Sequence, residues 1–222
     1  TIALVDREGL VTTADRDIPV HRRPFAQALP PAPDLLSAVE AFRPTALVGV
    51  SGSAGAFSEP VLRALAGINR RPIIFPLSNP TSCSECTADQ AFAWTDGRAV
   101  FASGSPFGPV VVNGRKVTPS QSNNAYIFPG VGLGVMLSRA RRVTSAMFLE
   151  AARALAALAT DATLAEGRLF SPLREIRDVS AAIAVAVMEV AYRDGLATRA
   201  RPADLAGFVR ANMYDAHYPE YR

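Results

Sequence analysis

Hydrophobic positions in the first 120 residues alternate between two patterns, short continuous apolar runs and longer stretches with a helical period. The runs cover residues 1–5, 46–50, 73–77 and 99–102. Runs of this length, bounded by turn residues, are typical of buried strands. Between the first two runs, the apolar positions 35, 36, 39 and 42 lie on one face of a helix. Alternating buried strands and amphipathic helices predict parallel strand pairing and an α/β fold.

Polar residues ahead of the periodic stretches predict where helices begin. A side chain that accepts a hydrogen bond from the first turn stabilises a helix start, and Thr87 with Gln90 matches a reciprocal capping box. Further starts are predicted at Asp34, Ser58, Thr144 and Ser180. Asn113-Gly114 is a preferred two-residue turn, so it predicts a hairpin over residues 111–118.

The pattern changes near residue 120, beyond which it is almost entirely helical. We therefore expect two regions, residues 1–120 and residues 121–222. The apolar stripes of the second region are expected to form core and subunit contacts. Three aromatic residues near the end have the character of an interface tail, namely Tyr214, Tyr218 and Tyr221.

Composition narrows the classes of partner. The 222 residues are 49% hydrophobic, enough to bury a sizeable core. Lys116 is the only lysine behind a net charge of +3, and the arginines are scattered, so nucleic acid is not an expected partner. The longest apolar run, 181–188, is shorter than the roughly 20 residues of a membrane span. With no secretory signal at its start, the chain is expected to be cytoplasmic and not membrane-bound.

Cys83 and Cys86 form a C-x-x-C pair, which can indicate redox or metal chemistry. No second pair exists, and the two histidines, His21 and His217, are remote in sequence. A zinc site would need distant ligands. Two reduced thiols at a helix start are therefore the favoured interpretation, and no metal ligand is predicted in the chain.

Asn79 follows the apolar run 73–77 and precedes Pro80. In open parallel sheets the ligand crevice lies outside the carboxyl ends of the strands, so a polar side chain there faces substrate or cofactor. Pro80 favours an extended backbone at Asn79 and limits where its amide can point. Ordinary turn chemistry that closes a strand is an equally good interpretation of Asn-Pro.

Gly49-Val50-Ser51-Gly52 ends the run 46–50 and has the small residues that allow a flat cofactor to approach the backbone. Its amides, next to a helix start, can also pair with polar ligand atoms. A loop of this composition can equally serve only to turn the chain.

Asn123 and Asn124 stand at the entry of a helix that carries Gly130, Gly132 and Gly134. One carboxamide is sufficient to cap a helix, which leaves Asn124 as a site candidate. The glycines are expected to let this helix lie close to the sheet and its ligand.

Asp6 ends the first apolar run and is followed by Arg7. An acid at the end of a strand in a dinucleotide fold typically accepts hydrogen bonds from the adenosine ribose, which favours NAD, whereas a nearby arginine accommodates the 2′-phosphate of NADP. Arg22 is expected to return to the same pocket, where its guanidinium would pair well with phosphate. Solvated surface arginines are the alternative.

Four blocks in order make the chain resemble malic enzyme, and the resemblance looks closest to bacterial forms. They are Gly49-Val-Ser-Gly52, Pro76-Leu-Ser-Asn-Pro-Thr81, Ala102-Ser-Gly-Ser-Pro-Phe-Gly-Pro109 and Asn123-Asn-Ala-Tyr-Ile-Phe-Pro-Gly130. The resemblance covers essentially the whole chain. It implies an incomplete Rossmann-type NAD(P)-binding domain over 1–120, with the first strand and glycine loop missing, and a helical continuation with an oligomerisation tail over 121–222.

The resemblance also implies an activity, the oxidative decarboxylation of L-malate to pyruvate and CO2 with NAD or NADP and a Mg or Mn ion. The catalytic residues and metal ligands would lie in the missing N-terminal part, so this chain alone is expected to be inactive. Asn79 and Asn124 match malate-binding asparagines, with Asn123 a weaker neighbour. Cofactor contacts are implied for Asp6, Arg7, Arg22, Gly49, Val50, Ser51, Gly52 and Asn79.

Two alternatives stay open. A malolactic enzyme resembles the same family but retains its cofactor and forms lactate. A noncatalytic dinucleotide-binding regulator would lack the upstream catalytic residues. By analogy with the family, a homodimer or homotetramer is expected.

Overall fold

The computed structural model describes residues 1–15 and 17–215. Within it the chain forms two compact units. The first, here called the sheet unit, comprises Thr1–Ser122 and Glu166–Arg168. The second, the helical unit, comprises Asn123–Ala165 and the chain from Leu169 onward.

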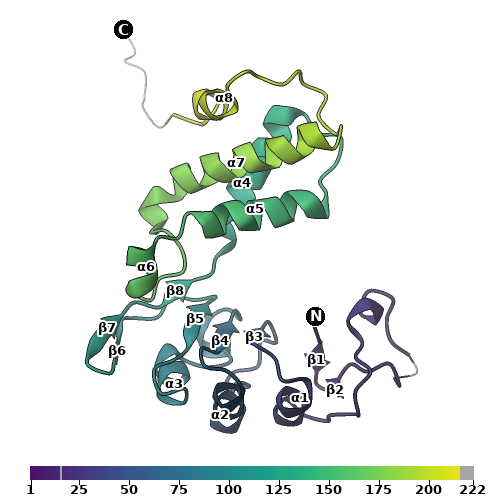
Figure 1. Ribbon diagram of the computed structural model, residues 1–222, viewed down its shortest axis with the longest axis vertical. Helices are drawn as coiled ribbons and strands as arrows, with labels where there is room; N and C mark the ends of the chain where they lie inside the picture. Colours follow the sequence, from purple (N-terminus) through teal and green to yellow (C-terminus); the bar gives the residue numbers. More distant parts are fainter. Residues whose placement is uncertain (16, 216–222) are drawn as a thin grey trace. The chain divides into compact units, whose positions relative to one another are not determined.

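A parallel sheet forms the centre of the sheet unit (Figure 1). Its strands are β3 (Ala46–Gly49), β4 (Ile73–Pro76), β5 (Val100–Ser103) and β8 (Ser120–Gln121), in the order β3-β4-β5-β8. The helix α1 (Leu35–Phe42) precedes β3, α2 (Glu59–Ile68) connects β3 to β4, and α3 (Ala88–Ala93) connects β4 to β5. The predicted α/β class with a parallel sheet is thus confirmed, and β8 is a strand that the pattern did not predict.

The core of the sheet unit lies between the sheet and these helices. Leu62 and Leu65 of α2 and Ile74 of β4 are completely buried. Phe92 of α3 packs at a tilt against Phe101 of β5, with ring centroids 5.9 Å apart. The apolar stripes of the helices therefore bury against the apolar runs, which is the packing that the two periodicities predict.

The predicted buried strand at the start of the chain is wrong. Only β1 (Val5–Asp6) is a strand, and it pairs antiparallel with β2 (Gly9–Leu10), outside the parallel sheet. Ile2 is 63% exposed, whereas Leu10 and Val11 are buried. The chain reverses after Asp6, with Gly9 at φ 110°, a backbone angle that glycine adopts readily. A local hairpin therefore replaces the expected sheet strand.

The prediction that residues 46–50 are a buried strand needs a smaller correction. β3 is the end strand of the four-stranded sheet, and Val48 is 54% and Val50 77% exposed. Alternate side chains of a strand point to opposite faces, and Leu47 packs against the core of the sheet unit. A continuous apolar run predicts burial of both faces, but within the sheet unit only one face of β3 is packed.

Helix starts are mostly where the sequence places them. Asp34, Thr87 and Thr144 accept hydrogen bonds from the first turns of α1, α3 and α5 (Ser145–Ala157). Ser58 occupies the N-cap position of α2 without a side-chain bond. The start at Ser180 is wrong, because α7 (Ile176–Arg193) continues directly from the 3-10 turn η4 (Leu173–Glu175) and buries Ser180 inside it.

The hairpin is confirmed as β6 (Val110–Val112) paired with β7 (Arg115–Val117). Asn113 and Gly114 have φ values of 50° and 75°. Positive φ at both central residues is the signature of a type I′ turn, which asparagine and glycine tolerate.

The helical unit is built around α7. It also contains α4 (Phe128–Ser138), α5, α6 (Asp161–Ala165) and α8 (Leu205–Ala211). Met147, Ile183 and Val187 are fully buried in its core. Among the described residues, no helix is both long and apolar enough to cross a bilayer.

Two of the three glycines of α4 face α7. A Cβ on Gly130 would lie 2.6 Å from the Cβ of Ile183, and one on Gly134 would lie 2.7 Å from the carbonyl oxygen of Ala184. The neighbour that these glycines accommodate is therefore a helix, whereas the sequence predicted the sheet. Gly132 has no neighbour within 4 Å of its added Cβ.

The predicted interface tail is described only in part. Tyr214 is 77% exposed. Tyr218 and Tyr221, like His217, lie outside the described residues.

Candidate functional site

The loops after β3, β4 and β5 lie next to one another because the strands that they follow are parallel neighbours. The hydrogen bonds of the sheet continue past the strand ends. Leu77 N donates to Gly49 O at 2.8 Å, and Gly104 N donates to Pro76 O at 3.0 Å. This edge of the sheet is where ligands bind in open parallel α/β folds, and it gathers Gly49–Gly52 and Asn79.

Asn79 is exposed at this edge, and its side chain is held from both sides. Its Oδ1 accepts a hydrogen bond from Ser105 Oγ at 2.6 Å, and its Nδ2 donates to Leu77 O at 3.3 Å. The Asn79–Pro80 peptide bond is cis. A Cβ on Gly104 would lie 2.2 Å from Leu77 O and 2.8 Å from Asn79 Nδ2, so only glycine fits there. The carboxamide is thus oriented before any ligand arrives.

The loop after β3 is tied to the end of β4. Gly52 N donates to Ser78 Oγ at 2.8 Å, and Gly52 has φ 68°. Gly49 is buried, whereas Val50, Ser51 and Gly52 are exposed. An exposed loop with small residues and a fixed backbone meets the requirement for close approach of a flat ligand.

A buried carboxylate that the sequence analysis missed joins these segments. Glu85 is 0% exposed. Its Oε1 accepts hydrogen bonds from Ser51 N at 2.9 Å, Ser51 Oγ at 2.8 Å and Ser78 Oγ at 2.5 Å. Its own carbonyl accepts from Phe57 N at 3.0 Å. The available signal in the sequence was that Glu85 is the only charged residue among positions 72–88.

The hydrogen bonds decide the charge of Glu85. Burial by itself raises the pKa of this carboxyl group, but the bonds from Ser78 and Ser51 favour the ionised form, and the net effect is a lowered pKa. Glu85 is therefore ionised at neutral pH.

The two cysteines flank this carboxylate in sequence and are both free thiols. Burial, together with the negative charge of Glu85, raises the pKa of Cys86 to about 12. A thiolate is the reactive form of cysteine, so Cys86 is inert at neutral pH. Among the described residues, no cluster of three or more His, Cys, Asp or Glu side chains is arranged to hold a metal ion.

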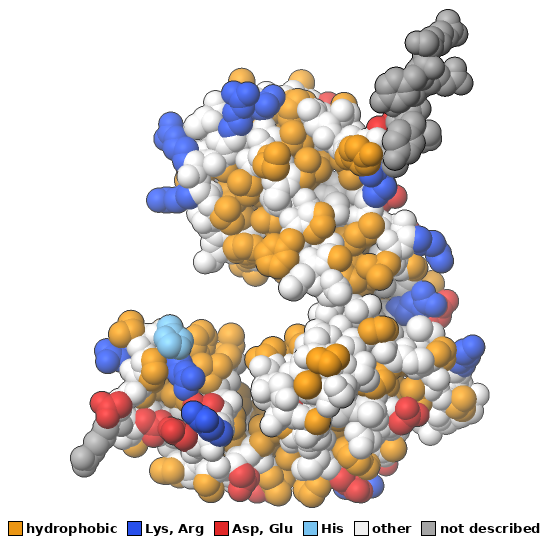
Figure 2. All heavy atoms as spheres, turned by 180° about the vertical axis from the view of Figure 1, so that it is seen from behind, with side chains coloured by type: hydrophobic (Ala, Val, Ile, Leu, Met, Phe, Trp, Pro, Cys, Tyr) orange, Lys and Arg blue, Asp and Glu red, His pale blue; other side chains and the backbone are white. Residues whose placement is uncertain are grey.

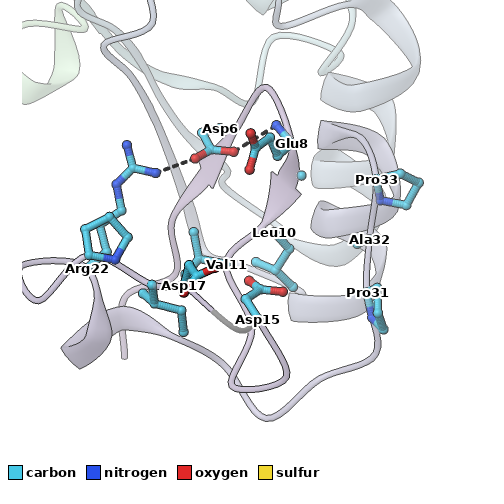
Figure 3. Close-up of a pocket in the computed structure, with 13 residues that line it drawn as sticks. Asp6, Glu8, Leu10, Val11, Asp15, Asp17, Arg22, Pro31, Ala32 and Pro33 are labelled. Carbon is cyan, nitrogen blue, oxygen red and sulfur yellow. Dashed lines mark hydrogen bonds and ion pairs between the residues drawn. The ribbon is translucent and has the colours of Figure 1, made fainter.

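Asp6 and Arg22 meet in a second part of the sheet unit (Figure 3). Arg22 Nη1 lies 2.5 Å from Asp6 Oδ2, and Asp6 Oδ1 accepts from Glu8 N at 2.8 Å. Both side chains line a cavity of about 430 Å³. Its other lining residues are Glu8, Gly9, Leu10, Val11, Asp15, Asp17, Ile18, Pro19, Pro31, Ala32 and Pro33. Arg7 is exposed and is not part of this lining.

Only one of the two adjacent asparagines acts as a cap. Asn123 caps the 3-10 turn η3 (Asn124–Tyr126), since its side chain accepts from Ala125 N at 2.8 Å. Asn124 is exposed, and among the described residues none forms a hydrogen bond with its side chain. Both belong to the helical unit, whereas Asn79 belongs to the sheet unit.

Curated relatives align with almost the whole chain. It is 48% identical over 221 residues to the "NADP-dependent malic enzyme, chloroplastic" of Oryza sativa subsp. japonica and 46% identical over 220 residues to the "NAD-dependent malic enzyme, mitochondrial" of Ascaris suum. Each alignment covers 99% of this chain, but 35% of the rice protein and 34% of the Ascaris protein. The chain thus spans about a third of the length of these relatives.

Solved structures show the same fold. Malic enzyme from Entamoeba histolytica matches with a TM-score of 0.74 at 22% identity, over 95% of this chain and 40% of that one. Malic enzyme from Pyrococcus horikoshii Ot3 matches with a TM-score of 0.60 at 24% identity, over 80% and 35%.

The relatives correct the expected cytoplasmic location. The rice and maize proteins are named chloroplastic, and the Ascaris protein is named mitochondrial. The expectation depended on finding no targeting signal, but a signal elsewhere in a longer protein leaves no trace in these residues.

The family comparison agrees with the four sequence blocks and with the fold. The family described as "Malic enzyme, NAD binding domain" matches residues 1–192. This match includes the loop after β3, the end of β4 and the asparagine pair at η3. The chain belongs to the malic enzyme NAD-binding domain family.

Proposed function

We propose that the complete protein containing this chain oxidatively decarboxylates L-malate to pyruvate and CO2 and reduces NAD or NADP. The observation that carries this proposal is Asn79, which is held by Ser105 at the carboxyl end of β4, beside the loop Gly49–Gly52. The same location is the ligand edge of parallel α/β folds, and the family membership specifies the ligands.

The dinucleotide would extend between two places in the sheet unit. Asp6 and Arg22 offer a carboxylate and a guanidinium in a cavity of about 430 Å³, which suits an adenosine ribose. Arg7 is a further candidate near Asp6. The nicotinamide end of the dinucleotide would lie against the loop formed by Gly49, Val50, Ser51 and Gly52, and near Asn79. When bound, NAD or NADP accepts the hydride from the hydroxyl-bearing carbon of malate.

Asn79 and Asn124 would bind malate, with Asn123 in a supporting role because its side chain is already used as a cap. A carboxamide donates to a substrate carboxylate and accepts from a hydroxyl group without adding charge. The described residues do not fit a metal site. We therefore propose that the ligands of the Mg or Mn ion lie in the rest of the protein, together with the catalytic residues.

Replacing Asn79 or Asn124 by alanine in the complete protein is expected to lower kcat/KM for malate about 10- to 100-fold, because each loses a hydrogen bond worth about 1–3 kcal/mol when its partner stays buried. Steady-state kinetics at saturating cofactor measures this loss. Asn212→Ala, at the exposed end of α8, is the matched control and should leave kcat/KM within about twofold of the parent.

Kinetics equal to the parent in both site variants would contradict the proposed malate site. The products separate the proposed function from its two alternatives. Pyruvate with net reduced nicotinamide supports a malic enzyme, lactate without net reduction supports a malolactic enzyme, and no turnover of malate supports a noncatalytic dinucleotide-binding protein.

Arg22 and Asp6 are expected to have opposite effects on cofactor choice. Arg22→Gln removes the group that can pair with a 2′-phosphate, so the Kd for NADP should rise about tenfold while the Kd for NAD changes about twofold or less. Asp6→Asn weakens acceptance from the ribose diol and should raise the Kd for NAD more. Calorimetric titration of both variants with both cofactors measures these effects, and parallel changes for NAD and NADP would refute the assignment.

We also propose that the protein is a homodimer or homotetramer. Figure 2 shows hydrophobic side chains gathered on the surface of the helical unit. Its exposed apolar residues include Met136, Phe148, Leu149 and Tyr214. Methionine and aromatic residues are enriched in subunit interfaces.

A further inference from the structure

The carboxylate of Glu85 lies directly behind the loop that follows β3. A Cβ built on Gly49 would be 2.5 Å from Glu85 Cδ and 2.8 Å from Oε2, so backbone and carboxylate are in close contact. Ser51 N and Ser51 Oγ both bond to Oε1. The carboxylate therefore contacts the backbone of the same loop in which Val50, Ser51 and Gly52 are exposed.

The network keeps this charge in place without neutralising it. Three hydrogen bonds of 2.5–2.9 Å converge on Oε1. Hydrogen-bond donors that converge on a carboxylate oxygen favour the ionised form, in agreement with the lowered pKa of Glu85. The partners, Ser51 and Ser78, are uncharged. A full negative charge thus remains behind the loop, in an interior where its field is screened less than in water.

Glu85 affects the same site in two ways, through its hydrogen bonds and through its charge. It ties Ser51 to Ser78, and so joins the loop Gly49–Gly52 to the residue that precedes Asn79. It also places a fixed negative charge where, according to the function proposed above, the nicotinamide end of the cofactor binds. The oxidised nicotinamide ring is positively charged, whereas the reduced ring is neutral.

We propose that Glu85 is a positioning residue that also sets the redox preference of the cofactor site, favouring the oxidised over the reduced dinucleotide. This inference rests on the proposed function. When the ring loses its positive charge in the reaction, it also loses its attraction to Glu85. Release of the reduced cofactor is thereby favoured over release of the oxidised one.

Glu85→Gln in the complete protein tests this proposal, because the variant removes the charge and preserves the shape. The amide oxygen can still accept from Ser51 and Ser78, and the amide nitrogen would stand at Oε2, whose contact with Ser78 N is long at 3.4 Å. We expect the Kd of the oxidised cofactor to rise about tenfold and that of the reduced cofactor to change about twofold or less. Fluorescence titration with both redox forms measures the two constants without turnover.

Two further variants make the result specific. Ser78→Ala keeps the charge but removes one bond to it, so both constants should rise by a common factor and their ratio should stay that of the parent. Glu40→Gln removes a charge from the exposed face of α1 and should leave both constants unchanged. Ser78→Ala also tests the proposal if Glu85→Gln does not fold, since a changed ratio with Glu85 intact would overturn it.

An equal change of both dissociation constants in Glu85→Gln would likewise overturn the redox preference. Glu85 would then only position the loop Gly49–Gly52. Failure of the proposed function is distinguishable, because the parent protein would then not convert malate to pyruvate with net reduction of NAD or NADP, whereas the two binding constants are measured without turnover.

Discussion

Replacement of Gly49 by alanine is expected to lower the free energy of unfolding of the sheet unit by about 2–4 kcal/mol, because hydrogen bonds to a buried charge are costly to break. The new Cβ would overlap Glu85 Cγ and Cδ at 2.8 and 2.5 Å. Glu85 cannot move aside cheaply, since Ser51 and Ser78 hold its carboxylate. Urea denaturation followed by the fluorescence of Trp94, the only tryptophan in the chain, measures the loss.

Gly67→Ala is the matched control in the same unit. Gly67 lies in α2, and an added Cβ would meet nothing within 4 Å. Alanine should therefore stabilise the helix by up to about 1 kcal/mol. Equal stability of the two variants would show that Gly49 and Glu85 are not in contact as described.

Alanine at Gly134 is expected to destabilise the helical unit by about 1–3 kcal/mol, the usual cost of overpacking a close contact. The added methyl group would lie 2.7 Å from a backbone atom, Ala184 O, and 2.9 Å from Val187 Cβ. The helices α4 and α7 would have to separate to relieve this overlap. Thermal and urea unfolding followed by far-UV circular dichroism measures the change.

Gly132→Ala tests whether the effect comes from helix approach or from loss of glycine itself. Gly132 is exposed on the same helix and has open space around its missing Cβ. Alanine there should be neutral or stabilising by up to about 1 kcal/mol. If Gly132→Ala is as destabilising as Gly134→Ala, the contact between α4 and α7 is not the cause.

Local signals in the sequence were sufficient wherever one segment decides its own structure. The capping box of Thr87 with Gln90 and the turn at Asn113-Gly114 each depend on residues within four positions of one another. The strand β4 combines an apolar run with a proline-containing turn. These features, and with them the position of Asn79 at a strand end, could be predicted because their geometry is set by short-range sterics and hydrogen bonds.

Predictions failed where the packing of a segment, and not its own composition, decides its structure. The run 1–5 has the composition of a buried strand, but it pairs locally with β2 and leaves Ile2 exposed. Ser180 has the chemistry of a helix cap, but α7 continues through it. The sequence pattern indicates which residues favour burial or a capping position. Tertiary packing decides which of them are buried and which cap a helix.

By itself, the sequence determined the order of strands and helices from α1 to β7, the α/β class and the small set of polar side chains at strand and helix ends. Tertiary structure alone decided that Glu85 supports the loop Gly49–Gly52, that Arg22 reaches Asp6, and that Gly134 faces α7. The residues in these contacts are 16 positions apart for Asp6 and Arg22, 34 for Ser51 and Glu85, and 50 for Gly134 and Ala184. Such contacts are specified by the packing of whole elements, which no local pattern encodes.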